Sequence, residues 1–140
     1  MKQLVVDASV AVKWFVPEIH HEAAGKILKS KWELLAPDII WAEVGNSLWK
    51  KKRRDEISAQ EAVGILKDFK RFPIQTYGSK LLLDSAWYLA QEFGVSVYDG
   101  MYLALAISRD CSLVTADRKF FDLFQKESIA FRFLWVEDAK

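Results

Sequence analysis

The sequence is poor in cysteine, in long apolar stretches and in excess charge of either sign. Cys111 is the single cysteine among 140 residues, so the chain cannot close an internal disulfide. Its place just before an apolar run suits a small buried hydrophobe better than a nucleophile. No apolar run approaches the roughly 18 residues of a membrane-spanning helix, and the opening residues MKQLVVDAS turn polar too early for a signal peptide. We therefore expect a cytoplasmic protein with no membrane segment.

What the sequence does contain is enough apolar material for one core. Hydrophobic residues make up 51% of the chain and aromatic residues 14%. Over 140 residues this composition is typical of one compact domain. The chain shows no internal repeat, no linker and no low-complexity tract. We therefore predict a single domain that spans residues 1–140.

Short apolar runs alternate with segments of helical periodicity along the whole chain. Strands are predicted at residues 3–6, 34–35, 73–76, 113–115 and 129–136, and helices at residues 10–15, 21–31, 37–54, 58–69, 79–93, 96–110 and 118–124. Pro37 and Asp38 are predicted to open the third helix. The helix at 96–110 is apolar on almost every side, which predicts burial. This alternation predicts an α/β sandwich with a mainly parallel central sheet flanked by helices.

Four acidic residues, Asp7, Glu43, Asp99 and Asp117, stand where an apolar element ends or turns. Asp7 and Asp117 directly follow predicted strands, and the functional crevice of a parallel sheet lies beyond the carboxyl ends of its strands. We therefore expect these two to meet, with Glu43 and Asp99 approaching on flanking helices. Carboxylates gathered in this way bind a divalent cation such as Mg2+, which acts naturally on phosphate esters.

Three of these acids also have a purely structural interpretation. Asp7 and Asp117 each precede a predicted helix, where aspartate caps free backbone amides. Ser96 and Asp99 form an S-x-x-D pattern, in which Asp99 would complement a helix N-terminus. Glu43 resists this interpretation because it lies within an apolar helical turn, where burial of an unpaired carboxylate costs several kcal/mol. Capping alone therefore does not account for all four.

Four segments of the chain resemble the PIN-domain ribonucleases, and within them the VapC-type toxins of prokaryotic toxin-antitoxin modules. They are LVVDASVAVKW at residues 4–14, PDIIWAEVGNSLWK at 37–50, VSVYDGMYLALA at 95–106 and SLVTADRKF at 112–120. Their order and spacing match the family, and the resemblance covers essentially the whole chain. It implies a PIN-like three-layer sandwich and endonucleolytic cleavage of RNA.

The resemblance also implies roles for individual residues. Asp7, Asp99 and Asp117 would bind Mg2+ or Mn2+, and Glu43 would complete the catalytic acidic site. Ser9 and Thr115 match small hydroxyl positions that orient the site, and Asn46 falls where the family often carries a polar residue. Gly100 replaces the alanine of many relatives and is expected to loosen its helical turn. As partners, the resemblance implies an RNA substrate, a cognate antitoxin protein and a second copy of the chain in a homodimer.

The densest charge in the chain directly follows the helix that carries Glu43. It consists of Lys50, Lys51, Lys52, Arg53 and Arg54. Cations at a helix C-terminus complement the helix dipole, but these five could equally bind RNA phosphates beside the acidic crevice. With the four acids set aside, 20 basic residues face 19 − 4 = 15 acidic ones, a balance of +5. A basic body around an acidic pocket suits a polyanionic substrate.

Two other functions remain open. A phosphoacceptor signalling domain also uses carboxylates and Mg2+ on an α/β sheet, but it requires an acidic pair beside the first strand and a lysine after a late strand. This chain has Asp7 without an acidic neighbour, and Thr115-Ala116-Asp117 at the late strand. The second alternative is a PIN-like fold that only binds a partner and does not catalyse.

Overall fold

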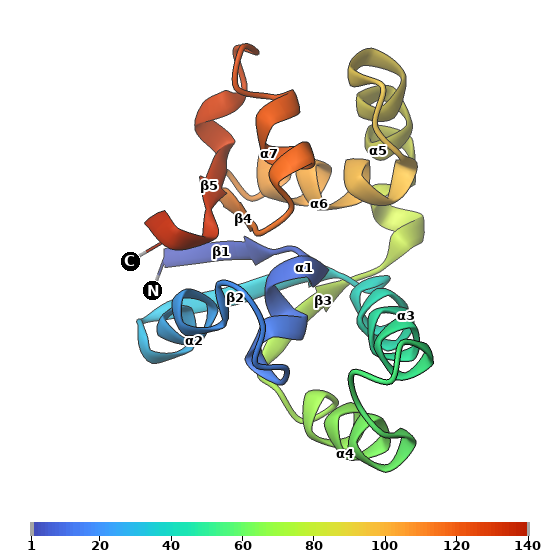
Figure 1. Cartoon of the computed structure of the whole chain (residues 1–140). Helices are drawn as coiled ribbons and strands as arrows, with labels where there is room; N and C mark the ends of the chain where they lie inside the picture. The colour runs from blue at the N-terminus through green and yellow to red at the C-terminus, as the bar shows by residue number, and fades with distance from the viewer. Residues whose placement is uncertain (1, 140) are drawn as a thin grey trace.

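The computed structural model describes residues 2–139, which form a five-stranded sheet between two groups of helices (Figure 1). The strands are β1 (Lys2–Val6), β2 (Trp32–Pro37), β3 (Ile74–Tyr77), β4 (Ser112–Thr115) and β5 (Phe133–Trp135). They pair in the order β3-β2-β1-β4-β5, and every pairing is parallel. The predicted α/β class is confirmed, and the sheet is parallel throughout.

The strand order reverses direction at β1. From β1 the chain builds outward through β2 to β3, then crosses back to place β4 on the other side of β1. In an open parallel sheet such a reversal leaves a crevice beyond the carboxyl ends of the two strands. The residues that follow β1 and β4, including Asp7 and Asp117, therefore flank this crevice.

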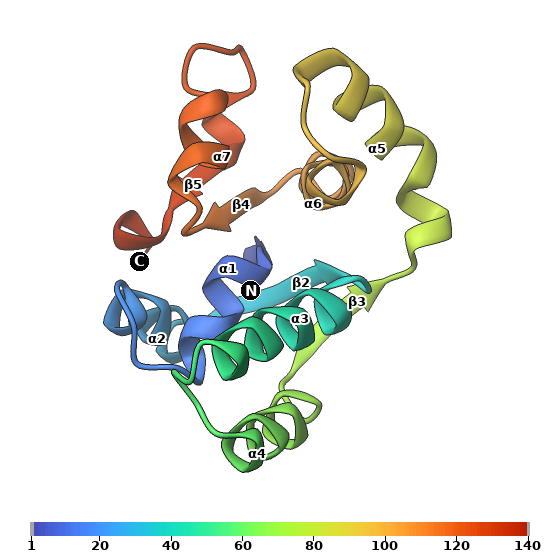
Figure 2. The same cartoon turned by 45° about the vertical axis from the view of Figure 1, so that its right-hand side comes forward.

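The helices lie in two layers, one on each side of the sheet (Figure 2). One layer holds α1 (Ala8–Ala11), α2 (His21–Lys29), α3 (Ile40–Arg53) and α4 (Ala59–Phe69). The other holds α5 (Ser79–Phe93), α6 (Val97–Ser108) and α7 (Arg118–Leu123). Short 3-10 turns cover residues 12–14, 130–132 and 136–138. Helices, sheet and helices make the three-layer sandwich that the sequence predicted.

The core lies between the sheet and these two layers, and α6 is its most buried helix. Seven consecutive residues of α6, Gly100–Ala106, are buried, which confirms the interpretation of its all-round apolar sequence. The two central strands are buried on both faces of the sheet, since Leu4, Val5, Leu113 and Val114 have no measurable exposure. Within residues 2–139, none of the helices combines the length and the apolar character needed to cross a membrane.

Two predicted element boundaries are wrong. Pro37 is the last residue of β2, where it pairs with Tyr77, and α3 begins at Ile40. Asp38 serves a different helix, because its Oδ1 accepts a hydrogen bond of 3.1 Å from the Ser79 amide at the start of α5. At the C-terminal end, residues 130–132 form a 3-10 turn, so β5 is only three residues long.

Candidate active site

Asp7 closes β1 and is held at the crevice by two hydroxyl groups. Its Oδ2 accepts hydrogen bonds from Ser9 Oγ at 2.7 Å and from Thr115 Oγ1 at 2.8 Å. The side chain is only 7% exposed. Asp7 occupies the N-cap position of α1, yet it makes no side-chain capping hydrogen bond. The capping interpretation is therefore wrong for this residue, and its carboxylate is oriented by side chains instead.

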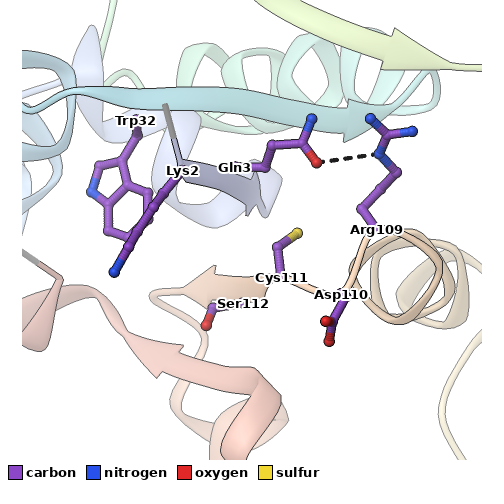
Figure 3. Close-up of a pocket in the computed structure, with 7 residues that line it drawn as sticks. All are labelled: Lys2, Gln3, Trp32, Arg109, Asp110, Cys111 and Ser112. Carbon is purple, nitrogen blue, oxygen red and sulfur yellow. Dashed lines mark hydrogen bonds between the residues drawn. The ribbon is translucent and has the colours of Figure 1, made fainter.

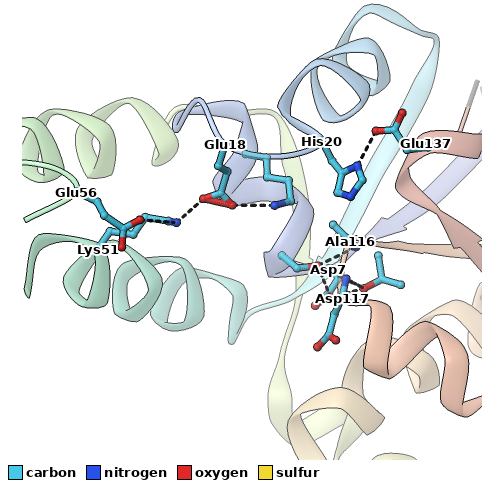
Figure 4. Close-up of polar contacts among 11 residues, drawn as sticks. Asp7, Glu18, His20, Lys51, Glu56, Ala116, Asp117 and Glu137 are labelled. Carbon is cyan, nitrogen blue, oxygen red and sulfur yellow. Dashed lines mark hydrogen bonds and ion pairs between the residues drawn. The ribbon is translucent and has the colours of Figure 1, made fainter. Parts of the chain in front are cut away.

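The two hydroxyls also tie the end of β1 to the end of β4 (Figure 4). Ser9 Oγ accepts a hydrogen bond of 3.0 Å from the Ala116 amide, and Thr115 Oγ1 accepts one of 3.0 Å from the Asp117 amide. A hydroxyl that accepts from a backbone amide has its single proton left for the carboxylate. Both hydroxyls thus point their protons at Asp7 and fix its orientation.

Asp117 has a structural role as well as a place at the crevice. Its Oδ1 accepts a hydrogen bond of 3.2 Å from the Phe120 amide and so caps α7. The capping interpretation is confirmed here. A monodentate cap leaves the second carboxylate oxygen for another partner, and the Asp117 side chain lines the same cavity as Asp7.

Asp99 lies in the first turn of α6, on the far wall of the crevice. The cap of this helix is Ser96, whose Oγ accepts a hydrogen bond of 3.0 Å from the Asp99 amide. The S-x-x-D pattern was thus correctly assigned to a helix start. The capping bond uses the Asp99 backbone, so the carboxylate is not required for it.

Glu43 projects from α3 and is paired with a tyrosine of α6. Tyr102 Oη donates a hydrogen bond of 2.7 Å to Glu43 Oε1. Glu43 is half-buried, and the Tyr102 hydroxyl is the hydrogen-bond partner that a carboxylate in an apolar helical turn requires. The bond joins helices on opposite sides of the sheet and sets the orientation of Glu43 at the crevice.

All four carboxylates line one cavity of about 350 Å3. Its lining consists of Asp7, Ala8, Ser9, Glu43, Asn46, Ser47, Lys50, Asp99 and Asp117. Residues from four separate segments of the chain therefore meet at the strand-order reversal. Asn46 joins the cavity from the exposed face of α3, one helical turn beyond Glu43.

Burial and the charges of neighbouring acids raise the pKa values of Asp7, Glu43 and Asp99. Burial raises the pKa of Asp99, and the charges of Asp7, Glu43 and Asp117 raise it further, to about 7, against a weaker hydrogen-bond effect of Ser96. Burial also raises the pKa of Asp7 and of Glu43, although hydrogen bonds from neighbouring hydroxyls oppose it in both. Carboxylates repel in this way only at short range, and a cation placed among them would relieve the repulsion.

The oxygen atoms that line the cavity suit a cation that keeps part of its water shell. Within residues 2–139, no three acidic, histidine or cysteine side chains close around one point as a complete metal cage. Mg2+ does not need such a cage, because it dehydrates reluctantly and is commonly bound through one or two carboxylates, waters and substrate phosphates. An open cavity of 350 Å3 lined by hard oxygen donors fits that mode of binding.

The five basic residues of the run at 50–54 point to different places. Lys50 lines the acidic cavity, and together with Arg53 and Arg54 it lines a neighbouring hollow of about 330 Å3. The Lys51 ammonium forms an ion pair with Glu18, as Figure 4 shows. Lys52 lines a groove between α3 and α4. The predicted RNA-binding run is thus divided among the faces of one helix.

A separate cavity of about 390 Å3 opens at the opposite end of the strands (Figure 3). It lies at the amino ends of the strands, where Arg109 Nε donates a hydrogen bond of 3.2 Å to the Gln3 side chain. Cys111 lines it and is half-buried, and burial raises the pKa of its thiol. A thiol that resists ionisation is a poor nucleophile, as the sequence predicted.

Tyr102 is the residue at this site that sequence reasoning missed. It follows Asp99 by three residues in a helix, so both side chains lie on one face. The phenol belongs to a helix that was predicted to be buried, and a buried tyrosine hydroxyl needs a hydrogen-bond partner. That combination could have indicated a contact with one of the acids. Ser47, a further lining residue, carries no comparable signal in the sequence.

Gly100 does not loosen α6, contrary to the expectation from its sequence. A Cβ atom at this position would lie 2.6 Å from the carbonyl oxygen of Ala86 in α5. Because Gly100 has no side chain, the backbone of α6 packs directly against the backbone of α5 at Ala86. This contact supports the turn of α6 that carries Asp99.

The chain is similar to known proteins over most of its length. The model of the PIN domain matches residues 4–124. Ribonuclease VapC3 of Pyrobaculum aerophilum is 36% identical over 126 residues, which cover 87% of this chain and 95% of that protein. The VapC ribonuclease Mb0985 of Mycobacterium bovis is 27% identical over 124 residues, or 89% of this chain and 93% of the relative.

Among solved structures, the crystal structure of PAE2754 from Pyrobaculum aerophilum superposes with a TM-score of 0.70 at 25% identity. The match covers 97% of this chain and 85% of that one. The two chains therefore share one fold over nearly the whole length of this chain.

Proposed function

The chain belongs to the PIN-domain family, and we propose that it is a VapC-type endoribonuclease, the toxin of a toxin-antitoxin pair, that depends on Mg2+ or Mn2+. The proposal treats residues 1–140 as one PIN domain. One observation carries it: Asp7, Glu43, Asp99 and Asp117 come from four elements to line one cavity at the strand-order reversal. Helix capping explains only Asp117 among them.

Asp7, Asp99 and Asp117 would hold the cation, directly or through its waters, with Glu43 completing the acidic lining. The bound cation supplies a water of lowered pKa and offsets the charge that develops on the phosphate during cleavage. The protein contributes orientation. Ser9 and Thr115 fix Asp7 through the bonds described above, and Tyr102 fixes Glu43 on the other wall.

The partner proposals rest on what the similar proteins are named. We expect the substrate to be RNA in the cytoplasm, since the curated relatives are named ribonucleases. We expect a cognate antitoxin protein to bind the chain. A structure titled "Toxin-antitoxin complex from Klebsiella pneumoniae" shares the fold over 97% of this chain, with a TM-score of 0.64 at 14% identity.

A homodimer is proposed from an apolar surface on α5. Leu81, Trp87 and Tyr88 are 76%, 57% and 70% exposed, and large apolar side chains gathered on one helix favour a protein partner. Sedimentation velocity of the wild type and a Trp87→Glu variant tests this proposal. A dimer that the substitution weakens is expected, and a monomeric wild type would contradict it.

The catalytic proposal is tested by cleavage of a mixed RNA pool with Mg2+ or Mn2+. Asp7→Asn should abolish cleavage, because it removes a negative charge at the site and keeps the shape of the side chain. Asp68→Asn on the exposed side of α4 is the matched control and should cleave like the wild type. Equal activity of Asp7→Asn and wild type would reveal a contaminating nuclease and overturn the catalytic claim.

The same assay separates the two alternatives. A wild type that binds RNA but leaves it intact in both metals would favour a PIN-fold binding module. A phosphoacceptor signalling domain would instead take up phosphate from a small phosphodonor such as acetyl phosphate. The structure offers little support for that activity, since Ala116 and Asp117 follow β4 where the signalling chemistry would need a lysine.

A further inference from the structure

One polar face of α3 runs from the acidic cavity to the basic hollow. Glu43, Asn46, Ser47 and Lys50 line the cavity, and Lys50, Arg53 and Arg54 line the hollow. These positions follow one another at intervals of three or four residues, which places them on one side of a helix. Lys50 belongs to both linings, so the cavity and the hollow adjoin at its side chain.

The other two cations of the run are directed elsewhere. Lys51 contacts Glu18 and lies 4.0 Å from Glu56, and its side chain is only 14% exposed. Glu18 is further held by Lys13 at 2.7 Å. Lys51 therefore joins α3 to the segment after α1. Lys52 lies beside the apolar residues of the groove between α3 and α4.

Arg53 is oriented by an aromatic neighbour on the exposed side of α3. Its guanidinium lies 4.7 Å from the centroid of the Trp49 ring, a cation–π contact that limits the conformations of a long side chain. Arg54 is 68% exposed and lies 3.8 Å from Glu56, which partly neutralises it. Lys50 and Arg53 are therefore the cations of this run best placed to meet an incoming anion.

We infer that Lys50 and Arg53 bind the phosphates of the RNA strand next to the cleaved bond, so that the strand leaves the acidic cavity along this face of α3. This inference rests on the proposed ribonuclease function. From Glu43 to Arg53 a helix rises about 15 Å, which exceeds the length of one nucleotide. Lys50 offers a point charge beside the cavity, whereas Arg53 offers a planar fork suited to a phosphate.

The test measures RNA binding without cleavage. A fluorescent single-stranded oligoribonucleotide is titrated with the Asp7→Asn protein from about 50 to 200 mM salt, at constant Mg2+. Each phosphate contact contributes about 0.7 to the slope of log K against log salt for a single strand. Lys50→Gln with Arg53→Gln should therefore reduce the magnitude of the slope by about 1.4. Lys50→Arg with Arg53→Lys should retain it.

Lys52→Gln with Lys67→Gln is the matched control, because it removes the same charge from residues outside this face. Its slope should stay close to that of the parent. Equal slopes for the two double variants would overturn the inference. Equal slopes would refute only the path along α3 if the wild type still cleaves RNA and Asp7→Asn does not. Absence of both cleavage and RNA binding would refute the proposed function as well.

Discussion

Thr115 Oγ1 donates a hydrogen bond of 2.8 Å to Asp7 Oδ2 across 108 positions of sequence. The bond joins the last residue of β4 to the residue that follows β1, at the point where the strand order reverses. Both groups are buried, with Thr115 fully inaccessible to solvent. The orientation of Asp7 therefore depends on correct pairing of the two central strands.

Thr115→Val should impair catalysis without altering the shape of the core. Valine keeps the volume of threonine but removes the donor to Asp7 and the acceptor for the Asp117 amide. Loss of a group that orients a metal ligand typically costs about 10- to 100-fold in metal affinity or activity. Thr115→Ser keeps the hydroxyl and should retain most activity. RNA cleavage rates of both variants decide this, and equal loss in both would point to packing alone.

Tyr102→Phe should raise the pKa of Glu43 further, since the phenol donates to the ionised carboxylate and favours it. In a plot of cleavage rate against pH, the pH range over which the rate rises should then move to higher pH. At a pH well below that range the rate should fall by about tenfold for each unit by which the pKa rises. Rates measured across the pH range test this, and a uniform loss at every pH would contradict the assigned contact.

The metal-free protein should lose stability as pH rises from about 4 to about 7. Asp99 has a pKa of about 7 in the folded chain against 3.8 in the unfolded chain. Between these values the folded state binds more protons, so the free energy of unfolding falls as pH rises. Above pH 7 this contribution should level off.

Urea denaturation of the metal-free protein at several pH values measures this slope. Asp99→Asn should flatten it, whereas the control Asp68→Asn in α4 should not. An Asp99→Asn protein with the wild-type slope would show that Asp99 titrates normally in the folded state.

Gly100→Ala should destabilise the chain, because the new methyl group would lie 2.6 Å from the Ala86 carbonyl oxygen. Overpacking of this kind costs about 1 to 3 kcal/mol. Gly64→Ala in α4 is the matched comparison, since a Cβ there has no neighbour within 4 Å. It should stabilise by about 0.5 to 1 kcal/mol through helix propensity. Thermal unfolding measures the change in stability of each variant. A change of the same sign in both variants would contradict the account of Gly100.

Much of this fold follows from local patterns that the sequence displays. The short apolar runs and the all-round apolar α6 are determined mainly by neighbouring residues, and they appear as predicted. The convergence of Asp7 and Asp117 follows from a general rule, that strand ends of a parallel sheet share one edge.

The features that were wrong or missing depend on contacts distant in sequence. Asp38 looks like the start of α3 but caps α5, because β3 brings Ser79 beside it. Gly100 looks like a weak helical position until Ala86 is placed against it. Whether Asp7 caps a helix or turns toward Thr115 is likewise decided by a residue more than 100 positions away.

The most direct test of the acidic site is the thermal midpoint of the wild type, Asp99→Asn and the control Asp68→Asn, each with and without Mn2+. Carboxylates that repel in the absence of metal make the site destabilising, so Asp99→Asn should raise the metal-free midpoint by about 4 °C for each kcal/mol relieved. The same variant should lose the rise that Mn2+ gives the wild type and the control. A lower midpoint for Asp99→Asn, with its response to Mn2+ intact, would contradict a metal site and identify Asp99 as a structural residue.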